Sequence, residues 1–284
     1  MKTILVPTDY SETAKNAAIY AINLAGQLQV KNIILYNAYQ APPMITETAV
    51  MPTATMPYFD IETFYDISKK SMEQFKESVQ NVCPSDIQIE TQIEYGGLDN
   101  DVKKLVKINA IDLIVMGISA TSKIEEVLIG STAISVVKNT DIPVFIVPSD
   151  ARYASVKNLM LACDFKKVAE TIPLQPLKSI LTATNAALYV VNVYENDNEM
   201  TSARAYQQEL LYSLLKEFEP HFHFENNEDF ITGINDFVKA NNIDLIVTIP
   251  KKHGFFEGLF KESHTKKLAF HSHVPLMYIH EHDL

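Results

Sequence analysis

The chain has 284 residues, which fits two domains of about 140 residues better than one. Its formal net charge of −11 repels phosphate backbones and acidic lipid surfaces, so nucleic-acid binding and membrane binding are not expected. It contains only two cysteines and no uncharged apolar run of about 18 residues, so neither a disulfide framework nor a membrane-spanning helix is expected, and the expected location is the cytoplasm.

The first half alternates short β-branched runs with longer amphipathic stretches. Five runs are predicted to be strands: Thr3–Val6, Ile33–Ala38, Ile87–Ile93, Asp112–Met116 and Val144–Val147. Helices are predicted over Ser11–Leu28, about Asp60–Val82, about Asp99–Asn109 and Ser131–Asn139. Strands that are apolar on both faces, each followed by a helix, predict βαβ units and a parallel sheet covered by helices on both sides.

The second half repeats this order. The word IDLIV occurs once in each half, and KTILVPTDY near the start aligns with KNLMLACDF, which pairs Asp9 with Asp164. The stretch IILYNAYQ aligns with LYVVNVYE and pairs Asn37 with Asn192. The sequence therefore predicts a tandem duplication.

Two segments fall outside the repeated pattern. The Pro- and Thr-rich stretch Ala41–Tyr58 has no period and predicts a long surface loop in the first half. The stretch Pro148–Ser155 is the expected linker. We therefore expect two tandem, doubly wound α/β domains over residues 1–148 and 156–284, each a five-stranded parallel sheet with helices on both faces.

A ligand cleft is expected beyond the carboxyl ends of the strands, where the strand order reverses. In the first half, the loops PTDYSET (Pro7–Thr13) and GISATSKIEEVLIGST (Gly117–Thr132) converge there. Glycine lets backbone amides approach a ligand, and a helix that begins at Ser131, directly after Gly130, would present unpaired N–H groups. An anion site without a lysine is one interpretation; an ordinary helix cap is the other.

Three stretches together resemble the universal stress protein family: ILVPTDYSETA near the N-terminus, ILYNAY in the second strand, and DLIVMG…GST…IPVFIVP. The resemblance covers both halves and implies a tandem member with a Rossmann-like fold of the adenine nucleotide alpha hydrolase type. Nucleotide-binding members of the family hold ATP with the motif G-x2-G-x9-G-[ST]. On this sequence the motif falls on Gly117, Ala120, Gly130 and Ser131.

The resemblance also implies roles in a site for ATP or another adenine nucleotide, with Mg²⁺ bridging its phosphates. Asp9 would contact the ribose and adenine, while Pro7 and Thr8 would wall the adenine pocket. Ala38 would meet the base through its backbone. The ribose and triphosphate would be lined by Gly117, Gly130, Ser131 and Thr132.

Ala120 departs from the motif, because the family has glycine there. If this position needs a left-handed conformation, a Cβ costs about 1–2 kcal/mol, which would weaken binding about tenfold to thirtyfold. If the α-phosphate packs on the α-carbon, the methyl group would exclude it. Both alternatives stay open at this point.

The second half departs from the motif at every glycine position, where Ile249, Lys252 and Glu262 stand. Glu262 would place a carboxylate where phosphates belong, and Pro250 removes an amide donor. Asp164 is retained, although a lone aspartate at a strand end usually caps a turn. We therefore expect no ATP site in this half.

All eight histidines lie in the second half, and two of them fall in its altered cleft. His253 and His264, with Asp164, form a candidate set for a metal or an anion. The alternative is that they are ordinary surface histidines, because no cluster with familiar zinc spacing accompanies them.

No motif for catalysis is present: the chain has no P-loop, no G-x-S-x-G elbow and no H-E-x-x-H. The sequence therefore predicts a binding protein rather than an enzyme, with slow ATP hydrolysis, which some family members show, left as an open alternative. Two functions are compatible with it. One is a nucleotide-binding stress-response module whose occupancy protein partners read; the other is a ligand-free interaction scaffold.

The last strand of each half suggests how the halves assemble. PVFIVP (Pro143–Pro148) and PLMYIH (Pro275–His280) are both apolar, and an unpaired edge on either would invite aggregation. Single-domain members of the family resemble dimers joined through this strand. We therefore expect the two last strands to pair antiparallel in an intramolecular pseudo-dimer, and any homodimer to use another surface.

Overall fold

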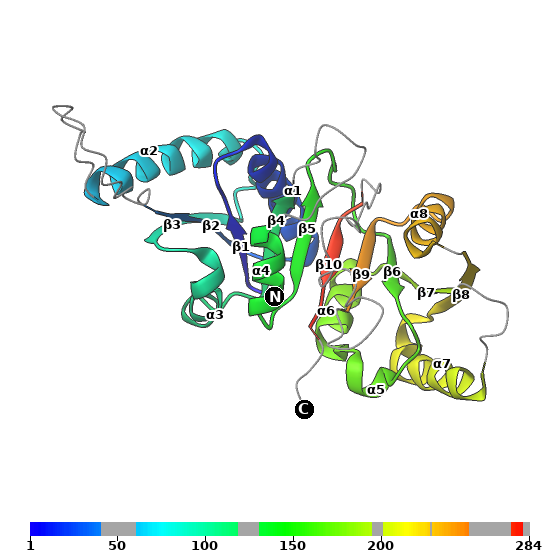
Figure 1. Ribbon diagram of the computed structural model, residues 1–284. Coiled ribbons are helices and arrows are strands. Elements are labelled where there is room, and N and C mark those ends of the chain that lie inside the picture. Colours follow the sequence, from blue (N-terminus) through cyan, green and yellow to red (C-terminus); the bar gives the residue numbers. More distant parts are fainter. Residues whose placement is uncertain (41–60, 119–130, 195–200, 228, 250–273, 281–284) are drawn as a thin grey trace.

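The computed structural model in Figure 1 describes residues 1–40, 61–118, 131–194, 201–227, 229–249 and 274–280. Within these ranges one ten-stranded sheet has the order β3-β2-β1-β4-β5-β10-β9-β6-β7-β8. The first half supplies β1 (Thr3–Pro7), β2 (Asn32–Tyr39), β3 (Gln88–Tyr95), β4 (Leu113–Ile118) and β5 (Val144–Pro148). The second half supplies β6 (Asn158–Ala162), β7 (Ala187–Tyr194), β8 (His221–Asn226), β9 (Leu245–Thr248) and β10 (Leu276–Tyr278). The five strands of each half are mutually parallel, which confirms the expected fold class.

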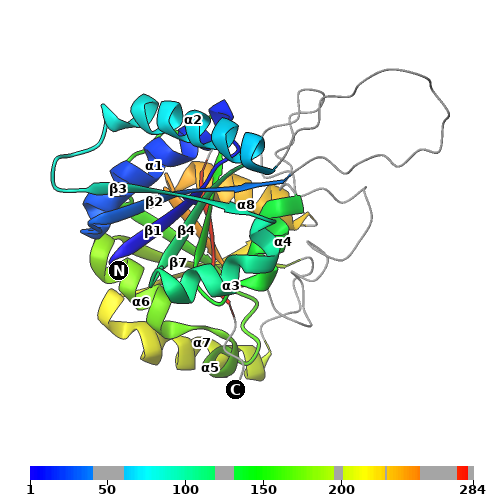
Figure 2. The ribbon, with the colours of Figure 1, turned by 90° about the vertical axis from the view of Figure 1, so that its left-hand side faces the viewer.

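Helices cover both faces of this sheet (Figures 1 and 2). The first half contains α1 (Glu12–Leu28), α2 (Ile61–Gln80), α3 (Leu98–Ile108) and α4 (Ser131–Asn139). The second contains α5 (Val168–Thr171), α6 (Leu174–Thr184), α7 (Ser202–Leu215), the 3₁₀ turn Lys216–Phe218 and α8 (Phe230–Ala240). Apolar side chains of α1, α2, α6 and α7 pack on one face, and those of α3, α4 and α8 pack on the other.

The hydrophobic core is shared between the two halves. Side chains along each strand alternate between the faces: in β4, Leu113 and Val115 face α1, while Ile114 and Met116 face α3 and α4. Each of the two core layers contains strand residues from both halves. The halves are therefore joined by packing on both sides of the sheet as well as by backbone hydrogen bonds.

The last strands of the halves pair with each other, as expected for an intramolecular pseudo-dimer. β5 and β10 are antiparallel, and they are the only antiparallel neighbours among the ten described strands. Phe145 lies opposite Met277 in this pair, and both side chains are fully buried. Each strand thus covers the edge that the other would leave open.

The linker lies against α1. The Asn16 amide donates to the carbonyl oxygens of Pro148 and Ala151, at 3.1 Å each. Gln27, three turns further along, donates to the carbonyl oxygen of Val156 at 2.9 Å. Two amide side chains on one helix thus satisfy the backbone of an irregular segment, which fixes its path.

The repeated aspartate of IDLIV has the same structural role in each half. Asp112 accepts hydrogen bonds from the backbone N–H groups of Lys2 and Thr3, at the start of β1. Asp244 accepts from the N–H groups of Lys157 and Asn158, at the start of β6. This part of the repeat therefore serves the sheet and is no sign of a site.

Candidate functional site

Three neighbouring strands of the first half end at the same edge of the sheet. β1 lies between β2 and β4, and these strands end at Pro7, Tyr39 and Ile118. Pro7 is the last residue of β1, Ala38 is the penultimate residue of β2, and Gly117 is the penultimate residue of β4. The fold thus places these three predicted residues at the reversal of strand order, the usual position of a ligand cleft.

The loop after β1 is fixed by hydrogen bonds to β2. The N–H of Thr8 donates to the carbonyl oxygen of Tyr36 at 2.8 Å, and the Asn37 amide donates to the carbonyl oxygen of Thr8 at 2.7 Å. Tyr10 then takes a left-handed conformation, with φ of 68°, and its N–H donates to the Thr8 hydroxyl at 2.9 Å. The Thr8 side chain is buried, and its hydroxyl shapes the turn by accepting this hydrogen bond from Tyr10.

Asp9 stands exposed at the tip of this loop. Its Oδ1 accepts hydrogen bonds from the backbone N–H of Ser11 at 3.0 Å and from the Ser11 hydroxyl at 2.6 Å. Ser11 in turn caps α1 by accepting from the N–H of Ala14. Within the described residues Oδ2 of Asp9 has no hydrogen bond, so one carboxylate oxygen holds the loop and the other is open to a ligand.

A buried polar chain behind the loop was not predicted from the sequence. The Tyr10 hydroxyl lies 2.8 Å from the Ser68 hydroxyl, which donates to the Asn37 amide oxygen at 2.6 Å. Burial raises the pKa of Tyr10, so it stays a neutral donor at physiological pH. These hydrogen bonds connect the loop after β1 to α2, because Ser68 belongs to that helix. The alignment of Asn37 with Asn192 was the only sign of it in the sequence.

Gly117 is required by packing. A Cβ at this position would lie 2.6 Å from the carbonyl oxygen of Thr13, in the first turn of α1. The glycine therefore lets the end of β4 touch the backbone of α1, beside the loop that carries Asp9. This explanation needs no ligand, although the contact does bring the end of β4 close to the start of α1.

The remaining predicted residues lie at or before α4. Ser131 and Thr132 are the first two residues of that helix, and Thr132 is exposed. Ala120 and Gly130 lie outside the described residues. The helix predicted over Ser131–Asn139 is therefore confirmed, whereas the motif stays a prediction.

The second half reproduces the loop of the first. The N–H of Cys163 donates to the carbonyl oxygen of Val191 at 2.9 Å, and the Asn192 amide donates to the carbonyl oxygen of Cys163 at 2.8 Å. Asp164 accepts from the N–H of Lys166 at 3.0 Å, as expected for a turn-capping aspartate. The aspartate at this position therefore shapes its loop in both halves and is not by itself a sign of a nucleotide.

Ile249 stands where the first half has Gly117. Its side chain is buried in the same core layer as the apolar side chains of α1. The helical segment that follows the loop after β6 is also divided in two, because α5 ends at Thr171 and α6 begins at Leu174. The second cleft thus differs from the first at a strand end as well as in its motif. Lys252, Glu262 and Pro250 lie outside the described residues.

The candidate metal set is only partly covered, since His253 and His264 also lie outside the described residues. Elsewhere in the described ranges, no three His, Cys, Asp or Glu side chains are grouped so that they could hold a metal. None of the described helices is long and apolar enough to cross a bilayer.

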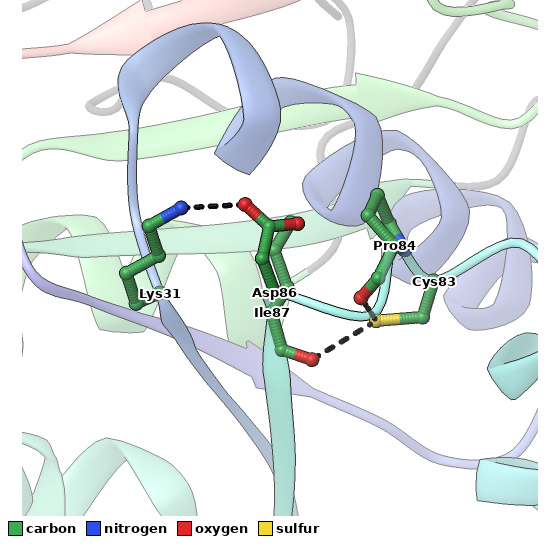
Figure 3. Close-up of polar contacts among 5 residues, drawn as sticks. All are labelled: Lys31, Cys83, Pro84, Asp86 and Ile87. Atoms are coloured by element: carbon green, nitrogen blue, oxygen red, sulfur yellow. Dashed lines mark hydrogen bonds and ion pairs between the residues drawn. The ribbon is translucent and has the colours of Figure 1, made fainter.

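Cys83 has a free thiol and lies in the turn before β3, at the opposite edge of the sheet from the carboxyl ends of the strands (Figure 3). Its thiol donates to the carbonyl oxygens of Pro84 and Ile87, at 3.6 and 3.5 Å. Burial raises its pKa, and the nearby charge of Asp86 raises it further. A thiol of this kind is a poor nucleophile.

Comparison with known proteins identifies the family to which the chain belongs. The model of the universal stress protein family matches residues 1–148. The chain belongs to the universal stress protein family. A universal stress protein of Methanocaldococcus jannaschii is 27% identical over 148 residues, which cover 51% of this chain and 81% of that protein.

Solved structures of this family extend the likeness to the second half. A universal stress protein from Archaeoglobus fulgidus covers 99% of this chain and 98% of its own, with a TM-score of 0.72 and 20% identity. The whole tandem fold is therefore shared with a member of the family. A universal stress protein solved in complex with cAMP covers 51% of this chain and 96% of its own, at 19% identity and a TM-score of 0.36.

Proposed function

We propose that this universal stress protein binds an adenine nucleotide, with ATP the first candidate, at the carboxyl ends of β1, β2 and β4. The nucleotide acts there as a regulatory ligand in a stress response, and protein partners read the occupied state. The open carboxylate oxygen of Asp9, at the tip of a loop that hydrogen bonds hold from both sides, is the observation that carries the proposal.

The geometry of the first half supports this choice of ligand. An exposed carboxylate with one fixed and one open oxygen suits the neighbouring hydroxyl groups of a ribose, which are hydrogen-bond donors. Ala38 and Gly117 lie at the ends of β2 and β4, on either side of β1. The start of α4 at Ser131 offers unpaired N–H groups for phosphates, so the site needs no lysine. Mg²⁺ would enter with the nucleotide, bound to its phosphates.

Membership of the family supports the same ligand class, because the family includes a protein solved in complex with cAMP. The family model matches residues 1–148, which is a reason to propose the site in the first half. The second half has Ile249 at the position of Gly117, and we propose that it binds no ATP.

The matched loops provide a sharp test. Asp9→Asn and Asp164→Asn remove the same charge from two loops that have the same backbone hydrogen bonds. Calorimetric titration with ATP, ADP and cAMP should give one site per chain in the native protein. Asp9→Asn should weaken binding about tenfold or more, since hydrogen bonds to charged groups contribute about 1.5–3 kcal/mol, whereas Asp164→Asn should leave it unchanged. Equal loss in both variants, or two sites per chain, would contradict the proposal.

A non-nucleotide scaffold is the second candidate, and one observation favours it. Gly117 and Asp9 both have structural explanations that hold without any ligand. Absence of binding by all three nucleotides, both in the native protein and after Ala120→Gly, would favour the scaffold. Binding gained only after Ala120→Gly would show that the methyl group closes an otherwise intact site.

A further inference from the structure

A groove outside the proposed nucleotide site runs between α1 and the linker. It has a volume of about 590 Å³, within the range of sites that hold small molecules. One wall is a face of α1, and the other is formed by Ser149, Ala151, Arg152 and Tyr153 of the linker. Both walls are held in place by Asn16, whose amide donates to the carbonyl oxygens of Pro148 and Ala151.

The floor of the groove is apolar and aromatic. Tyr20 and Tyr153 meet edge to face, with ring centroids 5.3 Å apart, and Ile19 and Ala151 lie beside them. Tyr20 and Ala151 are almost completely buried, whereas Tyr153 is half-buried, so part of its ring is open to the groove. Such a floor suits a flat apolar group, because aromatic side chains prefer edge or offset contacts with other rings.

Two cations lie on opposite walls. Lys15 comes from α1 and Arg152 from the linker, and neither forms an ion pair with any described residue. The Arg152 guanidinium donates to the Asn16 side-chain oxygen at 3.0 Å, which holds it beside α1 and leaves its other donors available. Glu12 also lines the groove, so cations outnumber anions there in a chain whose net charge is −11.

We infer that this groove binds a small organic anion whose carboxylate or phosphate lies between Lys15 and Arg152 and whose aromatic body packs on Ile19, Tyr20 and Tyr153. Arginine in a fixed position favours planar, bidentate anions, and lysine adds a point charge. The site is distinct from the proposed nucleotide cleft and does not depend on it.

Phenylacetate, phenyl phosphate and phenylacetamide are the probes for a test by nuclear magnetic resonance. The first two carry the expected anions, and the third has the same ring without a charge. The backbone amides of Ala151, Arg152 and Tyr153 should shift and saturate with phenylacetate or phenyl phosphate at a dissociation constant of about 1–10 mM, as expected for ligands of about ten non-hydrogen atoms. Whichever of these two probes binds more tightly shows whether the groove prefers a carboxylate or a phosphate.

Variants test whether Lys15 and Arg152 are responsible for binding the anion. Arg152→Gln keeps a donor for Asn16 but removes the charge, and it should weaken binding about threefold to tenfold, as should Lys15→Gln. Lys104→Gln, on α3 at the other face of the sheet, is the matched control and should have no effect. Equal shifts with phenylacetamide, unchanged affinity in Arg152→Gln and Lys15→Gln, or no saturable shift of these amides would overturn the inference.

Discussion

Phe145 lies opposite Met277 where the two halves of the sheet meet, and neither side chain is exposed. Met277→Glu would place an unpaired charge in a core layer that both halves share, which costs several kcal/mol. We expect the seam to open before either half unfolds, because each half keeps its own parallel strand pairs. Small-angle scattering should show an expanded particle while circular dichroism retains most of the secondary structure.

Met277→Leu is the control for this prediction, since it preserves volume and polarity and should keep the compact profile. If Met277→Glu also keeps the native scattering profile, the seam does not hold the halves together. Complete loss of secondary structure would instead mean that the halves cannot fold apart.

Gly117→Ala tests the close approach of β4 and α1. The new methyl group would lie 2.6 Å from a backbone oxygen of Thr13, so the protein should lose about 1–3 kcal/mol of unfolding free energy. Gly26→Ala in α1 is the matched control, because the new Cβ would meet nothing within 4 Å. This substitution should stabilise the helix by about 0.5–1 kcal/mol. Urea denaturation of both variants measures the difference, and equal stability would contradict the packing role of Gly117.

Gln27 holds the linker with both ends of its side chain. Its oxygen accepts from the Tyr153 hydroxyl and from the N–H of Val156, each at 2.9 Å, and its nitrogen donates to the carbonyl oxygen of Val156. Gln27→Ala should loosen the linker and speed trypsin cleavage after Arg152, with a loss of about 1–3 kcal/mol of stability. Cleavage is followed by mass spectrometry of the fragments.

Asn23→Ala provides the comparison on the same helix, since the Asn23 amide donates a local hydrogen bond to the carbonyl oxygen of Ile19. It should leave cleavage after Arg152 unchanged. An equal rate in Gln27→Ala and Asn23→Ala would show that Gln27 does not restrain the linker.

Cys83 should react slowly at neutral pH. Burial and, secondarily, Asp86 raise its pKa, so the thiolate that reacts with alkylating agents is scarcer than in a free cysteine until the pH approaches the raised value. Asp86→Asn removes the second cause and should lower the pKa, which shifts the rise in alkylation rate to lower pH. Peptide mapping after iodoacetamide treatment across pH 7–10 measures this, with N-acetylcysteine as the reference; a rate at pH 7 equal to that of the reference would refute it.

The repeat in the sequence was informative chiefly about structure. Asp112 and Asp244 close equivalent strand starts, and Asn37 and Asn192 hold equivalent loops. These residues recur because both copies of the fold have the same backbone groups to satisfy. The copies differ at the pair Gly117 and Ile249, where the end of β4 touches the backbone of α1 in the first half only through the absence of a side chain.

The sequence by itself determined the strands and helices, the doubling of the fold and the pairing of the last strands. The strands, the helices and the doubling follow from apolar periodicity and repeated words, which can be read along the chain. The pairing of the last strands was implied by the resemblance to the universal stress protein family, and the apolar edges of both strands agree with it. The sequence also placed Asp9, Ala38 and Gly117 at strand ends, since a strand end is a local property.

Only the tertiary structure decided what these residues touch. The contact between Gly117 and Thr13 joins residues that are distant in the chain, as do the bonds from Tyr10 to Ser68 and from Gln27 to the linker. Such contacts depend on how α1 and α2 lie on the sheet, which no local pattern specifies. The groove between α1 and the linker has the same origin, because its two cations come from segments that meet only after the strands between them have paired.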